Sequence, residues 1–195
     1  PSKITNLINS FKLLPGIGEK TAERLVFSLL DMEQENIEFF SENLKELKNS
    51  IKKCKICNGI TENDVCDICK DTSRSNVLCV LDDVKNVFLF EKMGVFSGHY
   101  HVLDGLISPI DGINPEDIGI DKLLERINKD NYSELMFAFK PSIEGETTAL
   151  YIKWVLSDAN IKVTRLASGL PMGADIEYVD NLTLQRAIND RKEVD

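Results

Sequence analysis

Two closely spaced pairs of cysteines are the strongest constraint that this sequence places on its fold. Cys54 and Cys57 form one Cys-x-x-Cys pair, Cys66 and Cys69 form another, and eight residues separate the pairs. In each pair the two thiolates can lie on one side of a tight turn, and two such pairs facing each other suit a tetrahedral zinc ion. Because cysteine fills all four positions, none is left for a catalytic water. The spacing therefore predicts one structural zinc ion per chain, held in a knuckle over residues 54–70.

Disulfide bonds or buried free thiols are the alternative to a metal at these cysteines. Disulfide frameworks are typical of small secreted domains rich in cysteine, but this chain has five cysteines in 195 residues. The fifth, Cys79, stands in an apolar run and is expected in the core. Lys53, Lys55 and Lys70 flank the four others and favour the thiolate form. Metal binding in a reducing compartment is the favoured interpretation.

The size and composition of the chain indicate one ordinary core with a small satellite domain. It has 195 residues, of which 43% are hydrophobic. No apolar stretch approaches the length of a membrane span, and the first residues lack the basic and apolar segments of a signal peptide. We therefore expect a cytoplasmic protein that has no membrane partner.

The net charge of −9 is unusual for a protein that binds nucleic acid, because phosphate contacts favour a basic surface. The charge is unevenly distributed along the chain. Up to residue 30 the basic side chains outnumber the acidic ones by four to two. The acidic surplus lies in residues 31–46 and in the C-terminal half. A local basic surface near the N-terminus is therefore compatible with the total.

Two short helices joined by a tight turn are predicted at the N-terminus. Apolar residues recur at helical spacing over residues 4–11 and 22–29, and the turn Leu-Pro-Gly-Ile-Gly lies between them at 14–18. In this turn Gly16 and Gly18 can take positive φ and let the backbone approach a partner closely. The turn matches the helix-hairpin-helix motif, which offers backbone amides to nucleic-acid phosphates.

The second helix of this hairpin is expected to begin near Gly18. The unpaired N–H groups and the positive dipole end of a helix attract anions. Lys20 and Arg24 lie four residues apart on one face beside that end. Sequence-independent contacts with DNA are therefore predicted at Gly16, Gly18, Lys20 and Arg24. A plain helical hairpin capped by glycines is the alternative.

Beyond residue 76, apolar strands alternate with amphipathic helices. Near-continuous apolar strands in such an order indicate an α/β fold with a mostly parallel sheet covered by helices on both faces. A further helix over residues 37–51 leads from the hairpin into the knuckle. The predicted strands are 77–81, 100–103, 135–139 and 161–167, and the helical patterns between them are 84–93, 120–127 and 149–156.

Ligands of such sheets bind beyond the carboxyl ends of the strands. Asp82 and Asp83 follow the first strand, and residues 140–146 follow the third. The two histidines, His99 and His101, should face one way on a strand. A metal site at these histidines is disfavoured, because no third ligand is near them in sequence.

A series of short motifs runs along nearly the whole chain. They are Leu-Pro-Gly-Ile-Gly at 14–18, the four-cysteine knuckle, Tyr-His-Val-Leu at 100–103, Ile-Ser-Pro at 107–109, Pro-Glu-Asp at 115–117, Glu-Gly-Glu at 144–146, Gly-Leu-Pro-Met-Gly-Ala-Asp-Ile-Glu-Tyr at 169–178 and Thr-Leu at 183–184. No single motif is specific. Together and in this order, the chain resembles the RecR family of bacterial recombination mediators, whose sheet is of the Toprim type.

The resemblance implies a non-enzymatic DNA-binding protein that acts in DNA repair. By this resemblance, the protein would act with RecO, and in some contexts with RecF, to help load RecA onto gapped DNA covered by single-strand binding protein. It also implies a homo-oligomer, from a dimer to a ring-like tetramer that surrounds DNA. The RecO-type partner would dock at an acidic Toprim cleft, with Asp82, Glu144 and Glu146 as candidates.

Four domains are expected from the resemblance and the composition together. They are a helix-hairpin-helix DNA-binding domain at 1–53, the zinc finger at 54–70, the Toprim domain at 77–172 and a C-terminal assembly segment at 173–195. Two positions depart from the usual family pattern. Lys140 stands where an Asn or a small polar residue is usual before the loop proline, and Ala174 stands where a second glycine is usual.

Enzymatic activity is the alternative that a Toprim sheet raises. Topoisomerases and primases with this sheet hold magnesium on an acidic residue after the first strand and on an Asp-x-Asp after the third. Asp82 suits the first role, but Lys140 and Ser142 occupy the Asp-x-Asp positions. Because a lysine repels the cation, we expect no catalytic residue and no topoisomerase, primase or nuclease activity. A further alternative is an adaptor that binds other proteins and does not contact DNA, which the net charge of −9 supports.

Overall fold

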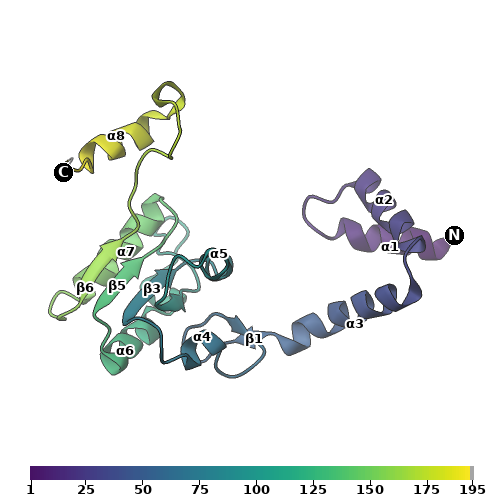
Figure 1. The fold of residues 1–195 in the computed structure, drawn as a ribbon, viewed down its shortest axis with the longest axis horizontal. Helices are drawn as coiled ribbons and strands as arrows, with labels where there is room; N and C mark the ends of the chain where they lie inside the picture. Colours follow the sequence, from purple (N-terminus) through teal and green to yellow (C-terminus); the bar gives the residue numbers. More distant parts are fainter. Residues whose placement is uncertain (194–195) are drawn as a thin grey trace. The chain divides into compact units, whose positions relative to one another are not determined.

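The structure, a computed structural model, describes residues 1–193 and divides into two compact units (Figure 1). Unit 1 spans Pro1–Lys52 and unit 2 spans Lys53–Asp195. The last two residues of the expected assembly segment, Val194 and Asp195, lie outside the described residues. None of the described helices is long and apolar enough to cross a membrane.

Unit 1 is entirely helical, as predicted. The hairpin helices α1 and α2 pack against each other, with Ala22 and Val26 of α2 buried between them. Lys12 and Glu19 form an ion pair across the turn. The helices of this unit are α1 (Ser2–Lys12), α2 (Glu19–Leu30) and α3 (Gln34–Ser50).

The apolar stripe of α3 is exposed in the described chain. Phe40, Leu44 and Leu47 keep 47%, 63% and 58% of their surface open to solvent, and the helix has no buried residue. The spacing of these residues predicts the helix correctly, but among the described residues of unit 1 the stripe packs against no core. An uncovered apolar surface of this kind is typical of a surface that another protein covers.

Unit 2 begins with the cysteine knuckle. A two-stranded ribbon pairs β1 (Lys52–Lys53) with β2 (Ile60–Thr61), and a single helical turn, α4 (Asp67–Lys70), follows. Cys54 and Cys57 lie in the loop that joins these two short strands. Helix α4 begins directly after Cys66, which serves as its N-cap residue.

The main sheet of unit 2 has four parallel strands in the order β4-β3-β5-β6. This confirms the predicted α/β class with a parallel sheet. In β3 the four residues from Leu78 to Leu81 are fully buried, as expected of a central strand covered on both faces. The elements are β3 (Val77–Leu81), α5 (Lys85–Met93), β4 (His99–Val102), the 3-10 turn η1 (Pro115–Ile118), α6 (Ile120–Asp130), β5 (Glu134–Phe137), α7 (Ile143–Val155) and β6 (Lys162–Arg165).

Alternate residues of the strands pack into two cores, one on each face of the sheet. Leu78 and Val80 of β3 contact the core formed with helices α6 and α7. Cys79 and Leu81 point to the opposite face, where α4 and α5 contribute Ile68, Val87 and Phe90. Each buried aliphatic side chain stabilises the fold by about 1.5–3 kcal/mol. The helices therefore cover both faces, as the alternating pattern predicts.

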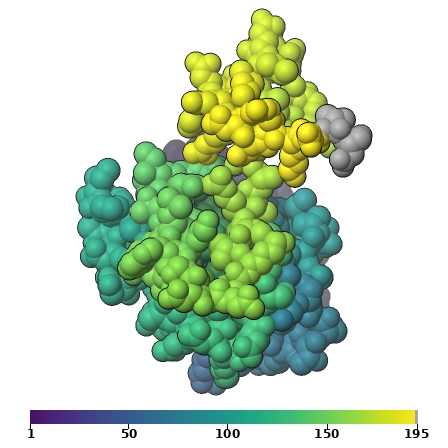
Figure 2. All heavy atoms as spheres, turned by 90° about the vertical axis from the view of Figure 1, so that its left-hand side faces the viewer, coloured from purple at the N-terminus to yellow at the C-terminus, as the bar shows by residue number. Residues whose placement is uncertain are grey.

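A C-terminal segment follows β6 and contains the 3-10 turn η2 (Ile176–Tyr178) and helix α8 (Asn181–Asn189). Figure 2 shows this segment, coloured yellow, projecting from the body of unit 2. Several of its large apolar side chains are uncovered, with Met172 fully exposed and Tyr178 82% exposed. Like α3, this segment presents apolar surface that no described part of the chain covers.

Candidate metal centre and nucleic-acid interface

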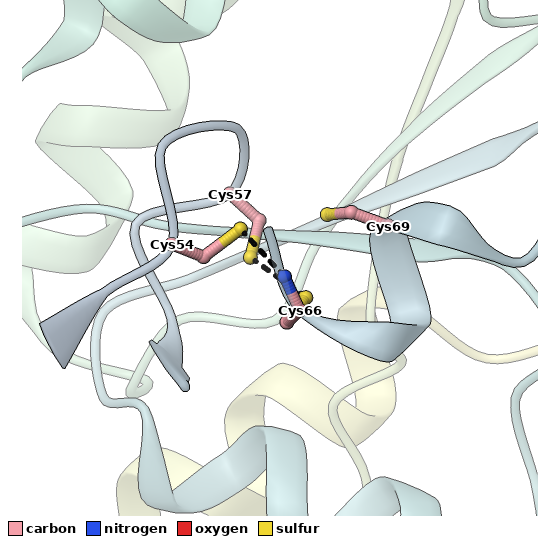
Figure 3. Close-up of side chains that lie close together, drawn as sticks. All are labelled: Cys54, Cys57, Cys66 and Cys69. Atoms are coloured by element: carbon pink, nitrogen blue, oxygen red, sulfur yellow. Dashed lines mark hydrogen bonds between the residues drawn. The ribbon is translucent and has the colours of Figure 1, made fainter. Parts of the chain in front are cut away.

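The knuckle brings the four predicted cysteines together. Their Sγ atoms all lie within 4.8 Å of one another, and those of Cys57 and Cys66 are 3.6 Å apart. Figure 3 shows three sulfurs grouped and the fourth, on Cys69, pointing toward them. Zinc–sulfur bonds of about 2.3 Å in a tetrahedron separate the sulfurs by about 3.8 Å. The cluster therefore has the size that a zinc ion requires.

Backbone geometry holds the first cysteine pair in a tight turn. Asn58 N–H donates to the Cys54 carbonyl at 3.0 Å, and Asn58 itself takes a positive φ of 59°. Backbone N–H groups also point at the sulfurs, from Gly59 to Cys57 Sγ at 3.4 Å and from Cys66 to Cys54 Sγ at 3.3 Å. Such donors stabilise thiolate charge and orient the ligands around a metal.

Hydrogen bonds between the cysteines shift their pKa values in opposite directions. Hydrogen bonds from Cys57 and Cys69 lower the pKa of Cys66 to about 2, while the hydrogen bond with Cys66 raises the pKa of Cys57 to about 12. One thiolate is thus stabilised by its protonated neighbours. All five cysteines of the chain are free, and a separation of 3.6 Å is far from the roughly 2 Å of a disulfide bond. A bound zinc ion supplies the positive charge that ionises the remaining thiols.

The knuckle is docked on the edge of the main sheet by hydrogen bonds. Val102 N–H donates to the Cys57 carbonyl at 2.8 Å, and Asn58 Nδ2 donates to the Val102 carbonyl at 2.8 Å. Asn58 Nδ2 also lies 3.0 Å from Asp104 Oδ1, which pairs with Lys53. Because Val102 belongs to the edge strand β4, the knuckle covers the end of an otherwise open sheet edge.

Arg126 brings a positive charge against the cluster, and the sequence pattern does not single it out. Its Nη2 lies 3.9 Å from Cys69 Sγ, although 57 residues separate the two positions. The flanking Lys53, Lys55 and Lys70, predicted to favour the thiolates, pair instead with Asp104, Asp64 and Asp67. A basic residue at a buried position of an amphipathic helix is the only sequence signal that marks Arg126.

The hairpin turn leaves the N-terminus of α2 open. Gly16 takes a positive φ of 81°, as predicted, whereas Gly18 is extended at φ −85° and ψ 172° and serves as the N-cap. No side chain caps this helix, and a Cβ atom at Gly18 would meet nothing within 4 Å. Lys20 and Arg24 are exposed beside it. The four predicted residues thus form one open surface with unpaired backbone N–H groups.

The residues predicted for the Toprim cleft lie at the carboxyl edge of the sheet but do not form a metal site. Nη1 of Arg165 donates to both carboxylate oxygens of Glu146, at 2.8 and 3.0 Å, and hydrogen bonding from Ser142 lowers the pKa of Glu144. Asp82 lies after β3, with Oδ1 buried and unpartnered. Among the described residues, the four cysteines are the one group of three or more potential ligands.

The cavity at this edge is mixed in charge. It has a volume of about 250 Å³, and Lys140, Arg165 and Arg186 line it together with Glu146. Asp82 is not among its lining residues. Steric crowding explains the glycine of the Glu-Gly-Glu motif, because a Cβ atom at Gly145 would lie 2.3 Å from the Lys140 carbonyl oxygen. The turn before α7 therefore requires glycine at this position.

The two histidines of β4 point to the same face, as predicted. His99 packs edge-on to Tyr132 with ring centroids 6.1 Å apart, and His101 is 2% exposed. Burial lowers the pKa of His101 to about 4. Within residues 1–193 no third metal ligand joins them.

Comparison with known proteins matches every part of this architecture. Family models match residues 4–48 (RecR, helix-hairpin-helix), 51–71 (the RecR zinc finger domain with four cysteine ligands), 76–167 (Toprim domain) and 169–192 (RecR, C-terminal). Recombination protein RecR of Staphylococcus aureus strain MRSA252 is 50% identical over 195 residues, which cover 100% of this chain and 98% of the relative. The corresponding protein of strain Mu50 has the same identity and coverage. The chain therefore belongs to the RecR family of recombination proteins.

Proposed function

We propose that this chain is a non-enzymatic recombination mediator of DNA repair in the cytoplasm. It binds DNA through residues 1–53 without sequence preference and acts with RecO-type and RecF-type proteins to help load RecA on gapped DNA. Residues 54–70 hold zinc, residues 77–172 dock the protein partner, and residues 173–195 serve assembly. The observation that supports this proposal most is the open N-terminus of α2 beside two cations.

The hairpin has the chemistry of a phosphate-binding site. The first-turn N–H groups of α2 have no side-chain cap, so they are available to phosphate oxygens. Lys20 and Arg24 form no ion pair within the described chain, whereas Glu19 is neutralised by Lys12. Backbone and cationic contacts of this kind position a nucleic acid without reading its bases.

A salt titration tests the hairpin. We expect Lys20→Ala with Arg24→Ala to weaken DNA binding and to lower the slope of log affinity against log salt by about 1.8 on duplex DNA and about 1.4 on single strands, because two phosphate contacts are lost. The matched control is Lys45→Ala with Lys48→Ala on α3, which removes the same charge from exposed positions of the same unit. A double hairpin variant that binds like the control at every salt concentration would instead support the protein-only adaptor.

Exposed apolar surfaces support assembly into a ring-like oligomer. The α3 stripe and the C-terminal segment both leave large apolar side chains uncovered. A ring retains DNA by encirclement with few phosphate contacts, which reconciles DNA binding with a net charge of −9. Light scattering should show a dimer or tetramer that Leu44→Glu with Leu47→Glu dissociates, while Lys45→Glu leaves it intact. A wild-type chain that stays monomeric with and without DNA would contradict assembly.

The carboxyl edge of the sheet is the proposed docking surface for the RecO-type partner. Glu144→Gln with Glu146→Gln should reduce its capture in a pull-down, and unchanged capture would move the docking site elsewhere. The same edge tests the enzymatic alternative, because Lys140 occupies a position where Toprim enzymes bind magnesium. Supercoil relaxation or primer synthesis with magnesium that Asp82→Asn abolishes would overturn the non-enzymatic proposal.

A further inference from the structure

A cavity of about 570 Å³ lies between the knuckle and helix α6, and its lining shares no residue with the cavity at the carboxyl edge of the sheet. Helices α6 and α4 pack against opposite faces of the sheet, and Arg126 of α6 reaches Cys69 of α4. Five of the side chains that line the cavity are cationic and two are carboxylates. In a chain whose net charge is −9, this concentration of positive charge is unusual. We call it the α6 cavity.

The cationic side chains of the α6 cavity differ in whether they form ion pairs. Lys53 and Lys55 pair with Asp104 and Asp64. Lys122 and Lys129 are exposed, and in the described part of the chain neither forms an ion pair. They lie seven residues apart, and therefore on one face of α6, separated by about 10.5 Å along the helix axis. These two lysines are free to bind an anion.

A buried imidazole gives a second and independent indication of a ligand. His101 lines the α6 cavity, is 2% exposed, and its Nδ1 has no hydrogen-bond partner. Buried polar groups are nearly always hydrogen-bonded, so this group calls for a partner from the cavity. Burial and the nearby Arg126 keep the imidazole neutral, with its pKa lowered to about 4. A neutral imidazole has one N–H to donate.

We propose that the α6 cavity is a second contact site for the phosphates of a nucleic-acid strand, with Lys122 and Lys129 as the phosphate ligands and His101 as a hydrogen-bond donor. The proposal rests on the DNA-binding function argued above and adds a contact in unit 2. A nucleic-acid strand offers a phosphate at every nucleotide, so two can meet lysines about 10.5 Å apart. Five cationic side chains against two carboxylates, Glu125 and Asp130, leave the lining net positive. The regular phosphate array of a nucleic acid suits the fixed spacing of the lysines better than the irregular charges of an acidic peptide do.

The test uses the full-length, zinc-loaded protein with single-stranded and duplex oligonucleotides and with inorganic phosphate. Lys122→Ala with Lys129→Ala removes the proposed ligands. Lys85→Ala with Lys92→Ala is the matched control, because these exposed lysines are also seven residues apart on a helix of unit 2. Fluorescence anisotropy measures affinity over a range of salt. The imidazole NMR signals report the site itself, since the chain has two histidines and His99 is an internal reference.

We expect the α6 double variant to bind oligonucleotide on the order of tenfold more weakly than wild type, with the salt slope reduced by about 1.4 on single strands and about 1.8 on duplexes. Oligonucleotide should shift the His101 signals in wild type and in the Lys85/Lys92 control, and not in the α6 double variant. Equal affinity and equal His101 shifts in the α6 variant and the control would overturn the inference. A shift of the His101 signals with inorganic phosphate, together with no shift with either oligonucleotide, would overturn the nucleic-acid assignment.

The hairpin variant separates this inference from the proposed function. If Lys20→Ala with Arg24→Ala binds DNA like wild type while the α6 variant does not, the hairpin assignment fails and the α6 cavity stands. If only the hairpin variant loses affinity, the α6 cavity is excluded as a nucleic-acid site and the hairpin stands.

Discussion

Arg126 Nη2 lies 3.9 Å from Cys69 Sγ and joins the buried side of α6 to the zinc knuckle. The same guanidinium donates through Nη1 to the Tyr100 carbonyl at 2.5 Å and lies 5.5 Å above the Tyr132 ring. The knuckle is thus attached to the sheet through side-chain contacts as well as through the chain itself. A closed set of four thiolates attached in this way has a structural role.

Replacing Arg126 by methionine should loosen the knuckle and destabilise unit 2. The buried Tyr100 carbonyl loses its donor, and the cysteine cluster loses a nearby positive charge. We expect the free energy of unfolding to fall by about 2–4 kcal/mol and zinc to pass faster to a chelating dye. The control is Lys153→Met on α7, which is exposed. Wild-type stability together with a wild-type rate of zinc transfer would refute the structural coupling.

Replacing Cys57 by serine should remove zinc before it changes any other property. A metal with three thiolates is held less tightly, and the free energy of metal binding is part of the folding free energy. We expect less than one zinc per chain by atomic absorption, a loss of stability on the order of 3 kcal/mol or more, and impaired assembly. Cys79→Ala is the matched control, because this cysteine is buried in β3 and should keep the metal. A zinc-free Cys57→Ser protein with normal stability and assembly would contradict the structural role.

Local patterns predict most of the fold. The apolar run 77–81 coincides with β3, and the predicted helix at 84–93 agrees with α5 to within one residue. The strand predicted at 100–103 lies one residue earlier, at His99–Val102. Periodicity succeeds because burial on the two faces of the sheet dictates which residues are apolar. The cysteine spacing likewise predicts the cluster, since its ligands come from two local turns.

Contacts between distant parts of the chain cannot be predicted in this way. Arg126 reaches Cys69 across 57 residues, and Asn58 reaches Val102 across 44. Both depend on how the knuckle docks on the sheet, which no local pattern encodes. The α3 stripe shows the converse, because its period predicts a helix but says nothing of which surface covers it. Mixed charge at the carboxyl edge, supplied by Arg165 and Arg186, also arises only from the folded arrangement.

The two hairpin glycines should respond differently to alanine. Gly16 has φ +81°, where an L side chain is strained, so Gly16→Ala should cost about 1–2 kcal/mol of stability. Gly18 has φ −85° and open space at its Cβ, so Gly18→Ala should cost less than about 1 kcal/mol. A methyl group at the open end of α2 should nevertheless weaken DNA binding. Thermal unfolding and anisotropy measure the two effects, and a Gly18→Ala protein with wild-type DNA affinity would exclude close backbone approach there.

A partly buried ion pair between Arg74 and Glu91 makes stability depend on pH. Arg74 holds Glu91 through two hydrogen bonds of 2.9 and 2.5 Å, and Tyr100 donates its hydroxyl to the same carboxylate at 2.8 Å. The hydrogen bonds from Arg74 lower the pKa of Glu91 below its ordinary value of 4.5, despite desolvation that raises it. Tyr100 adds to this lowering, while burial, and then the hydrogen bond with this carboxylate, raise the pKa of the Tyr100 hydroxyl.

Glu91→Gln should therefore remove part of the acid sensitivity of folding. A carboxylate whose pKa is lowered by folding contributes stability above the ordinary value of 4.5, and this contribution is lost as pH falls through the lowered pKa. In urea unfolding, wild type should be more stable than Glu91→Gln at pH 7, and the difference should shrink steadily below about pH 4.5. Glu116→Gln, at an exposed position, is the control and should follow wild type throughout. A constant difference between wild type and Glu91→Gln from about pH 7 to about pH 3 would show that the pair contributes through packing rather than through its charge.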